Sequence, residues 1–268
     1  MTYETLKIEK RENGAAWLWL NRPDAHNAMS EQMLLDVPRA VAELEADAEV
    51  RVVVLTGVGA TFCAGGDLKW MLSIMKLSRA ERIEESRKVA TLLGALNNLG
   101  KPLIGRINGP AYGGGVGMVS VCDIAIAVRS ARFALTETKL GLVPANIGPY
   151  VVNCLGANNA RQVFFNAKPF DAERAKELGL VGEVVDPDDL DAAVDREVDY
   201  VLACAPGAVA MTKKLLFYID RNGLEGSIDY AMEQLALAWE GDEGAEGIQA
   251  FLDKRKPCWS ESVERGDR

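Results

Sequence analysis

Two glycine-rich segments of this 268-residue chain each precede a stretch with the composition of a helix. The first is Gly65-Gly66-Asp67 and the second is Gly113-Gly114-Gly115. Glycine has no Cβ, so its N–H group can approach a ligand closely, and a helix N-terminus adds unpaired N–H groups. Two such amides that converge on one atom would form an oxyanion hole. Taken singly, each segment can equally be a tight turn in which glycine serves only a steric need.

Glu137 is the acidic residue best placed to exchange protons. It lies in the segment ARFALTETKLGLVPA, close to the apolar residues Phe133 and Leu135. A carboxyl group in apolar surroundings has a raised pKa and can transfer protons near neutral pH. The alternative is a solvated carboxylate that pairs with Lys139 or Arg132.

The single histidine, His26, limits the other chemistries. One histidine excludes a His-rich metal site within the chain, and a Ser-His-Asp triad would have to use His26. His26 can also contact a ligand or only line its loop. The patterns HExxH, GxxxxGK[ST] and GxSxG are absent, and Met118 stands where GxGxxG requires glycine. We therefore predict no metal site, P-loop or nucleophile elbow.

The composition is that of a globular, acidic protein. Lys and Arg number 30 against 39 Asp and Glu, which gives a formal net charge of −9, and 49% of the residues are hydrophobic. An acidic chain is repelled by nucleic acid and by anionic lipid, so we expect neither as a partner. The five cysteines are dispersed without a CxxC pair, and the first residues, MTYETLKIEKREN, are polar. These features favour reduced thiols, no transmembrane helix and a cytoplasmic location.

The elements that would position these residues alternate between strand and helix. Strands are predicted over 3–9, 15–20, 51–56, 103–107, 123–128 and 181–185. Helices are predicted from Ser30 to about 45, from 68, over 78–99, 116–121, 171–178, 188–204, 207–219, 225–239 and 244–254. Pro38 predicts a kink or a late start in the first helix. A strand, a glycine loop and a helix thus occur twice, and the chain after Pro144 is mostly helical. The pattern predicts an α/β body followed by a helical tail.

The order of these motifs resembles the crotonase (enoyl-CoA hydratase/isomerase) superfamily along nearly the whole chain. The matching segments are LNRPDAHNAM (20–29), RVVVLTG (51–57), TFCAGGDL (61–68), KPLIGRINGPAYGGGVG (101–117), CDIAIA (122–127), FALTETKLGLVPA (133–145), AKPFDAERAKELGLVGEVV (167–185) and GIQAFLDKRKPCW (247–259). Within them, TETKLGLVPANIGPYVV (136–152) is similar to hydratases of branched-chain and isoprenoid catabolism, including methylglutaconyl-CoA hydratase-like proteins.

The resemblance implies a spiral of ββα turns with an acyl-CoA site over residues 1–200, and a helical trimerisation region over residues 201–268. It implies a homotrimer or a dimer of trimers, because apolar residues of the tail need a partner surface. The ligand would be an acyl-CoA, with coenzyme A as part of the substrate and no prosthetic group.

The resemblance also assigns the candidate site residues. The amides of Gly66 and Gly114 would bind the thioester oxygen, and Glu137 would move protons at the acyl group. The residues expected to border the bent coenzyme A are Ala25, His26, Ala64, Asp67 and Leu68.

One position departs from the familiar two-glutamate hydratases. The first glutamate belongs at Gly117, which has no side chain, so we expect a gap there that water or a branched acyl chain fills. A single carboxylate also resembles the Δ3,Δ2-enoyl-CoA isomerases. We interpret the sequence as that of a hydratase that acts on a 2-enoyl-CoA. The alternatives are an isomerase, another crotonase reaction such as thioester hydrolysis or C–C cleavage, and a non-catalytic binding protein.

Overall fold

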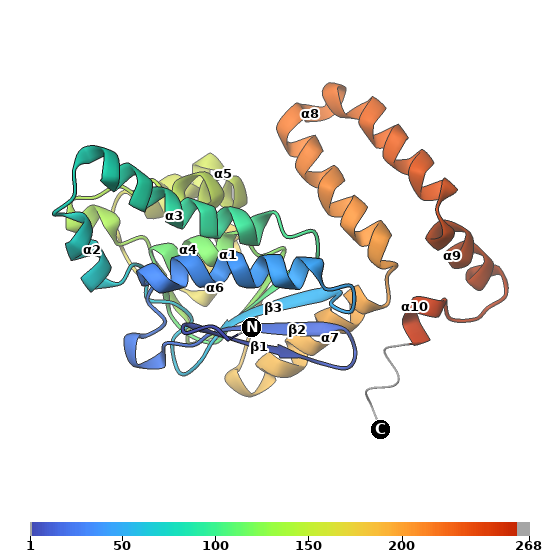
Figure 1. Cartoon of the computed structure of the whole chain (residues 1–268), viewed down its shortest axis with the longest axis horizontal. Coiled ribbons are helices and arrows are strands. Elements are labelled where there is room, and N and C mark those ends of the chain that lie inside the picture. The colour runs from blue at the N-terminus through green and yellow to red at the C-terminus, as the bar shows by residue number, and fades with distance from the viewer. Residues whose placement is uncertain (1, 262–268) are drawn as a thin grey trace.

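The computed structural model describes residues 2–261, which form two sheets covered by helices (Figure 1). The larger sheet has the strand order β1-β2-β3-β4-β6-β9. Its strands are β1 Leu6–Lys10, β2 Ala15–Leu20, β3 Val52–Gly57, β4 Leu103–Ile107, β6 Ile124–Val128 and β9 Glu183–Val185. The β1–β2 pair is antiparallel and every later pair in this sheet is parallel. The confirmed α/β class thus rests on a mainly parallel sheet.

A small second sheet has the order β5-β7-β8 and was not predicted. Its strands are β5 Ala111–Tyr112, β7 Arg132–Ala134 and β8 Phe170–Asp171. Strands of two or three residues are too short to show a period in the sequence. This sheet begins directly before the second glycine segment, so it helps to position that loop.

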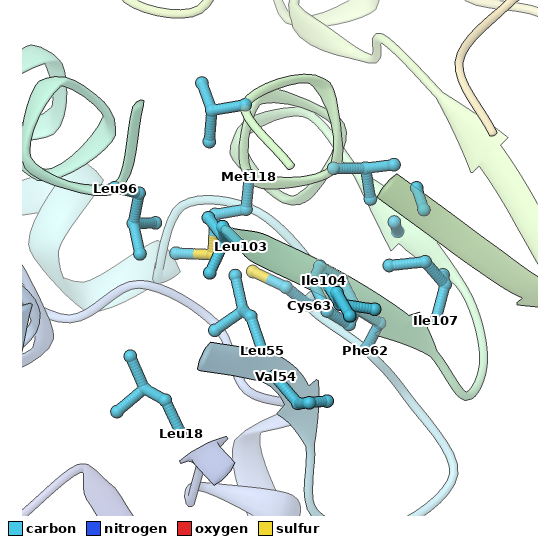
Figure 2. Packing of buried hydrophobic residues seen from close by; sticks show 14 of the residues in the cluster. Leu18, Val54, Leu55, Phe62, Cys63, Leu96, Leu103, Ile104, Ile107 and Met118 are labelled. Atoms are coloured by element: carbon cyan, nitrogen blue, oxygen red, sulfur yellow. The ribbon is translucent and has the colours of Figure 1, made fainter. Parts of the chain in front are cut away.

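The core lies between the larger sheet and the helices above it. All six residues of β3 are buried, as expected for a β-branched run in a parallel sheet. Leu18, Leu55 and Leu103 from successive strands pack toward Met118 and Leu96 (Figure 2). This packing fixes the ends of the strands from which the site loops emerge.

The helices follow the predicted order with shifted ends. They are α1 Glu31–Ala46, α2 Leu68–Ile74, α3 Arg79–Asn97, α4 Gly114–Ser120, α5 Gly148–Phe164, α6 Ala172–Leu178, α7 Leu190–Leu202, α8 Pro206–Glu240, α9 Asp242–Leu252 and α10 Cys258–Glu261. Short 3-10 turns cover η1 Pro23–Ala25, η2 Glu137–Leu140 and η3 Pro187–Asp189. Ser30 and Ser78 cap α1 and α3 as predicted, each accepting a hydrogen bond from a backbone amide.

Two details of the predicted helices are wrong. Of the two alternatives predicted at Pro38, a kink or a late start, the late start does not occur, because the helix begins at Glu31 and runs through the proline to Ala46. The helix predicted from Val116 begins at Gly114, so part of the second glycine segment belongs to its first turn. Glycine has low helix propensity, which hid this start.

The tail projects from the body as two helical arms (Figure 1). Non-helical Gly223, at φ 68°, breaks α8, and the rings of Tyr218 and Tyr230 stack across the break with centroids 3.8 Å apart. On α8, the nearly buried Lys213 ammonium donates to Asp123 Oδ2 at 2.6 Å, which attaches the arm to the body. These observations match the two separate helices predicted there.

Arg51, directly before β3, holds both ends of the tail. Its guanidinium donates to the carbonyl oxygens of Leu202 and Cys204, each at 2.7 Å, and of Trp259 at 2.8 Å. The segment between those points therefore leaves the body and returns to one side chain.

Within residues 2–261, no single helix is long and apolar enough to cross a membrane. The pair 187–202 and 206–240 meets the length and composition criteria only when taken together, across a bend of 100°.

Candidate active site

The loops that follow β3 and β4 lie against each other. Cys63 and Ala111 form a parallel bridge, and the Tyr112 amide donates to the Cys63 carbonyl at 2.9 Å. A Cβ on Gly65 would lie 2.8 Å from the Tyr112 carbonyl oxygen and 3.7 Å from the Gly114 nitrogen, and Gly65 has φ 92°. Both the close approach and the left-handed conformation require glycine here. The structure thus brings together two segments that lie about 50 residues apart, as expected where parallel strands end at one edge of a sheet.

The amides of Gly66 and Gly114 are left free by this arrangement. The Met29 amide donates to the Gly65 carbonyl, and the Asp67 amide donates to the Met29 carbonyl. The amide of Gly66, which lies between Gly65 and Asp67, takes part in neither bond. Gly114 is the first residue of α4, where an N–H group has no partner within the helix. In the described part of the chain, neither amide donates to a protein acceptor. Convergence of the two amides on one oxygen stays a prediction.

Glu137 reaches the start of the second glycine segment. A Cβ on Gly113 would lie 3.1 Å from Oε1 of Glu137. Oε2 of Glu137 is buried and has no hydrogen-bond partner among residues 2–261. Burial raises the pKa of this carboxyl group, and a hydrogen bond from its own backbone offsets only part of that effect. The raised pKa that the sequence predicts for Glu137 thus has a physical cause, and its role in proton exchange stays a prediction.

The alternative pairing of Glu137 with Arg132 or Lys139 does not occur in residues 2–261. Arg132 donates instead to the carbonyl oxygens of Ser130 and Ala131, at 3.3 and 2.9 Å. A carboxyl group that is desolvated without a cation is a costly arrangement and is typical of functional sites.

The prediction of a gap beside Gly117 is wrong. A Cβ on Gly117 would lie 2.7 Å from Cγ2 of Ile147 and 3.2 Å from Cδ1 of Leu93. The side chain of Ile147, from a segment that follows Glu137, fills the space beside Gly117. That Gly117 stands in place of the first hydratase glutamate stays a prediction from the resemblance. Glycine has no side chain, and the residues next to it in the sequence do not show which distant side chain will fill the space beside it.

The residues predicted to border coenzyme A lie together on two adjoining loops. The Ala64 amide donates to the His26 carbonyl at 3.0 Å, and His26 Nδ1 lies 3.2 Å from Thr61 Oγ1. His26 is exposed, Ala25 is partly buried, and Leu68 begins α2 with 72% of its surface exposed. These residues form a connected surface next to Gly66.

Asp67 holds these loops together. Its Oδ2 accepts from Arg22 at 2.9 Å, and its Oδ1 accepts from the Lys69 amide at 2.9 Å, which caps α2. Burial alone would raise the pKa of Asp67, but hydrogen bonds from Arg22, Lys69 and Trp70 outweigh it and lower the pKa. Both oxygens of Asp67 are thus engaged within the protein, so a direct role toward coenzyme A stays a prediction.

Sequence reasoning missed Arg22 and Asn27. Asn27 is fully buried at φ 55°; its side chain accepts from the Arg22 amide at 2.9 Å and donates to the carbonyls of Val58 and Thr61 at 3.0 and 2.8 Å. Asparagine tolerates the left-handed conformation, so its place just after a proline turn was a usable signal.

Exposed apolar side chains lie on both segments that flank the glycine loops. On one side they follow Gly66 in the sequence, and on the other they follow Glu137. They are Leu68, Leu72 and Met75 from the α2 segment, and Leu140, Leu142 and Val143 from the η2 segment. Exposed apolar surface beside a desolvated carboxyl group fits a ligand with an acyl chain.

The model of the enoyl-CoA hydratase/isomerase family matches residues 10–262. The chain belongs to this family. It is 32% identical to a crotonyl-CoA hydratase of Syntrophomonas wolfei over 262 residues, covering 96% of this chain and 98% of the relative. It is 30% identical to the peroxisomal Delta(3,5)-Delta(2,4)-dienoyl-CoA isomerase of Arabidopsis thaliana over 270 residues, covering 96% and 97%.

The fold is also that of solved members of the enoyl-CoA hydratase/isomerase family. The crystal structure of an enoyl-CoA hydratase from Shewanella pealeana superposes with a TM-score of 0.92 at 34% identity, covering 96% of this chain and 97% of that one. The crotonase fold and membership in a family of CoA-thioester enzymes, expected from the sequence motifs, are therefore confirmed. Among residues 2–261 no group of three or more His, Cys, Asp or Glu side chains is placed to hold a metal ion.

The contact at Gly65 makes a first prediction for this member of the family. Gly65→Ala would clash with the Tyr112 carbonyl oxygen and also force alanine into a left-handed conformation. We expect a loss of about 2–4 kcal/mol in the free energy of unfolding, measured by denaturant unfolding at fixed protein concentration. Gly179→Ala is the matched control, since Gly179 has φ 85° with nothing within 4 Å of a Cβ; it should cost only about 1 kcal/mol. Equal losses in the two variants would show that the Tyr112 contact does not constrain the loops.

The raised pKa of Glu137 makes a second prediction. The native state keeps this proton to higher pH than the unfolded chain, so the contribution of Glu137 to the free energy of unfolding falls as pH rises above about pH 4. Glu137→Gln keeps the shape and never ionises. Unfolding measured across pH should therefore find the variant more stable than the unmodified protein at about pH 8 and equal to it near pH 4. A difference that does not vary with pH would contradict desolvation as the cause.

Proposed function

We propose that this protein adds water to the double bond of a 2-enoyl-CoA thioester. The observation that carries the proposal is the desolvated carboxyl group of Glu137, whose Oε2 has no hydrogen-bond partner among residues 2–261, close to the amides at the start of α4. A group that costs stability without a partner is expected where it serves chemistry. The hydratase name of the Syntrophomonas relative supports the same reaction.

The amides of Gly66 and Gly114 would hold the thioester oxygen. Addition of hydroxide at the β-carbon leaves negative charge on that oxygen as an enolate. Two preorganised N–H donors stabilise the charge as it develops, and each donor of this kind is worth about 3 kcal/mol in the barrier.

Glu137 would carry the protons in both directions. Its carboxylate orients a water molecule and takes one proton as the oxygen bonds to the β-carbon. The resulting carboxylic acid then gives a proton to the α-carbon as the enolate collapses, so Glu137 returns to its starting state. The raised pKa of Glu137 suits this exchange, because a group with a pKa nearer the working pH both accepts and releases a proton more easily.

Coenzyme A would serve as the handle of the substrate, and no prosthetic group takes part in the proposed steps. The surface assigned to it comprises Ala25, His26, Ala64, Asp67 and Leu68. Their two loops are joined by the His26–Ala64 backbone hydrogen bond and by the Arg22–Asp67 ion pair. The similarity of residues 136–152 to methylglutaconyl-CoA hydratase-like proteins favours a branched acyl group.

Double-bond migration is the second candidate reaction. The observation that favours it is the side chain of Ile147, which fills the space beside Gly117. The resemblance assigns the first hydratase glutamate to that position. A lone carboxylate can shuttle one proton between two carbons without water. A purely binding role is disfavoured, because it gives no reason to keep an unpaired, desolvated carboxyl group at the ligand surface.

A third prediction tests the role of Glu137. Glu137→Gln should lower turnover about 10²–10⁴-fold, because the amide keeps the shape and loses proton transfer. Affinity for a saturated acyl-CoA should stay nearly unchanged. The measurement is the absorbance of enoyl-CoA thioesters, with product analysis that separates hydration from double-bond migration.

The outcomes of that assay distinguish the candidate functions. Hydration by the unmodified protein supports the proposal, and migration alone supports the isomerase. Full activity in Glu137→Gln would remove this residue from the mechanism, whereas binding of every thioester without turnover would leave the non-catalytic role.

We propose further that residues 201–268 form a trimerisation region beside a body of residues 1–200, in a homotrimer or a dimer of trimers. The tail exposes apolar side chains that water solvates poorly, which are Leu235, Leu237, Ile248, Phe251 and Leu252. We expect the assembly in the cytoplasm, with neither nucleic acid nor membrane as a partner.

A fourth prediction tests the assembly. Light scattering at micromolar concentration should give a multiple of the 29.0 kDa chain mass. Phe251→Asp should weaken the assembly, because the side chain of Phe251 is 83% exposed on the tail. Phe165→Asp is the matched control, since Phe165 is 75% exposed but lies on the body. A monomeric unmodified protein would contradict the proposal.

A further inference from the structure

Met29 contacts both glycine segments of the candidate active site. It lies between η1 and α1, is only 2% exposed, and pairs with Gly66 in an isolated parallel bridge. The Met29 amide donates to the Gly65 carbonyl at 2.7 Å, and the Asp67 amide donates to the Met29 carbonyl at 3.0 Å. The backbone of Met29 therefore holds the residues on either side of Gly66.

The bond to the Gly65 carbonyl also orients the amide of Gly66. The carbonyl of Gly65 and the N–H group of Gly66 belong to one planar peptide unit, and this unit is trans. In a trans unit the N–H group points opposite to the carbonyl. Because Met29 binds the carbonyl, it directs the N–H group of Gly66 away from itself, and this N–H group stays available to a ligand.

The side chain of Met29 reaches the other proposed donor. A Cβ on Gly114 would lie 1.9 Å from Cε of Met29 and 3.0 Å from its Sδ. Apart from α4 itself and the chain neighbours of Gly114, no other atom of the described residues lies within 4 Å of that point. The thioether thus fills the space beside Gly114. Methionine is long and unbranched, which lets it fill such a space, whereas leucine ends one atom earlier.

The residues next to Met29 keep it in this place. Arg22 donates to the carbonyl of Ala28, the residue before Met29, and also to Oδ2 of Asp67 at 2.9 Å. Ser30, the residue after Met29, caps α1. The chain around Met29 is thus tied to the first glycine segment and to a helix of the core.

We propose that Met29 is a positioning residue of this site. Its backbone sets the direction of the Gly66 amide, and its side chain sets the place of Gly114, so that the two N–H groups meet at one thioester oxygen. The inference rests on the proposed function and adds a residue that acts through the two glycines. Hydrogen bonds weaken steeply as their geometry degrades, and a misplacement of about 1 Å can cost about 10²-fold in rate.

The first test is the variant Met29→Leu, which keeps most of the apolar volume and removes the atom that reaches Gly114. With the enoyl-CoA that the unmodified protein turns over fastest, we expect kcat to fall about tenfold and KM to change little, because the lost contact concerns charge that develops in the transition state. Met33→Leu is the matched control. Met33 is also fully buried, and none of its atoms lies within 4 Å of a Cβ on Gly114, so this variant should keep its kcat.

A measurement without turnover separates positioning from general packing. Difference infrared spectroscopy of butyryl-CoA with ¹³C at the thioester carbonyl reports hydrogen bonds to that oxygen, because they lower the stretching frequency of the carbonyl. The frequency should fall when the saturated thioester binds the unmodified protein. The shift should be smaller in Met29→Leu and unchanged in Met33→Leu.

A double variant tests the contact between Met29 and Gly114 directly. Gly114→Ala adds a methyl group that displaces Cε of Met29, and Met29→Leu removes that atom. The loss of kcat in the double variant should therefore be about tenfold smaller than the product of the two single losses, as expected for residues in contact. Losses that multiply would show that the two residues act independently.

The outcomes separate this inference from the proposed reaction. An unchanged kcat or an unchanged carbonyl shift in Met29→Leu would overturn the positioning role and leave the reaction intact. No shift in the unmodified protein would show that the amides do not hold the thioester oxygen, which rejects the role of Met29 as well. A shift that depends on Met29, without turnover of any enoyl thioester, would keep the positioning role and reject the reaction.

Discussion

A backbone-to-backbone contact between the loops after β3 and β4 is the constraint on which the site depends. Gly65 sits against the Tyr112 carbonyl oxygen in a conformation that other residues rarely adopt. That contact leaves no room for a side chain and brings Gly66 next to the start of α4. The parallel sheet supplies the approach, since both loops leave the same edge. The site is therefore a property of main-chain geometry more than of side-chain identity.

Polar side chains then hold this geometry in place around a group that opposes stability. Asn27 bonds to three backbone groups, and Asp67 joins Arg22 to the start of α2. Glu137, by contrast, is desolvated and has an oxygen without a partner. The polar groups of the neighbouring loops make their hydrogen bonds within the protein, so the fold can retain one carboxyl group that costs stability at the position proposed for catalysis.

Much of this arrangement was predictable from the sequence, and the rest failed for identifiable reasons. The buried run at β3, the caps at Ser30 and Ser78 and the desolvation of Glu137 each leave a local pattern. The small sheet and the glycine residues that begin α4 leave no such local pattern in the sequence. The occupant of the space beside Gly117 is set by Ile147, a tertiary contact that spans 30 positions. Local chemistry was thus readable, whereas the filling of space between distant segments was not.

The double attachment of the tail to Arg51 has a consequence for how this chain can change. The segment leaves the body near Leu202 and returns near Trp259, and the same guanidinium group binds both ends. An insertion or deletion near Gly223 changes how far the helical arms extend and leaves both contacts with Arg51 in place. The first glycine loop leads into α2, which lies at the end of the body opposite the arms (Figure 1). Changes of length in the arms beyond Lys213 therefore leave both ends of the segment at Arg51.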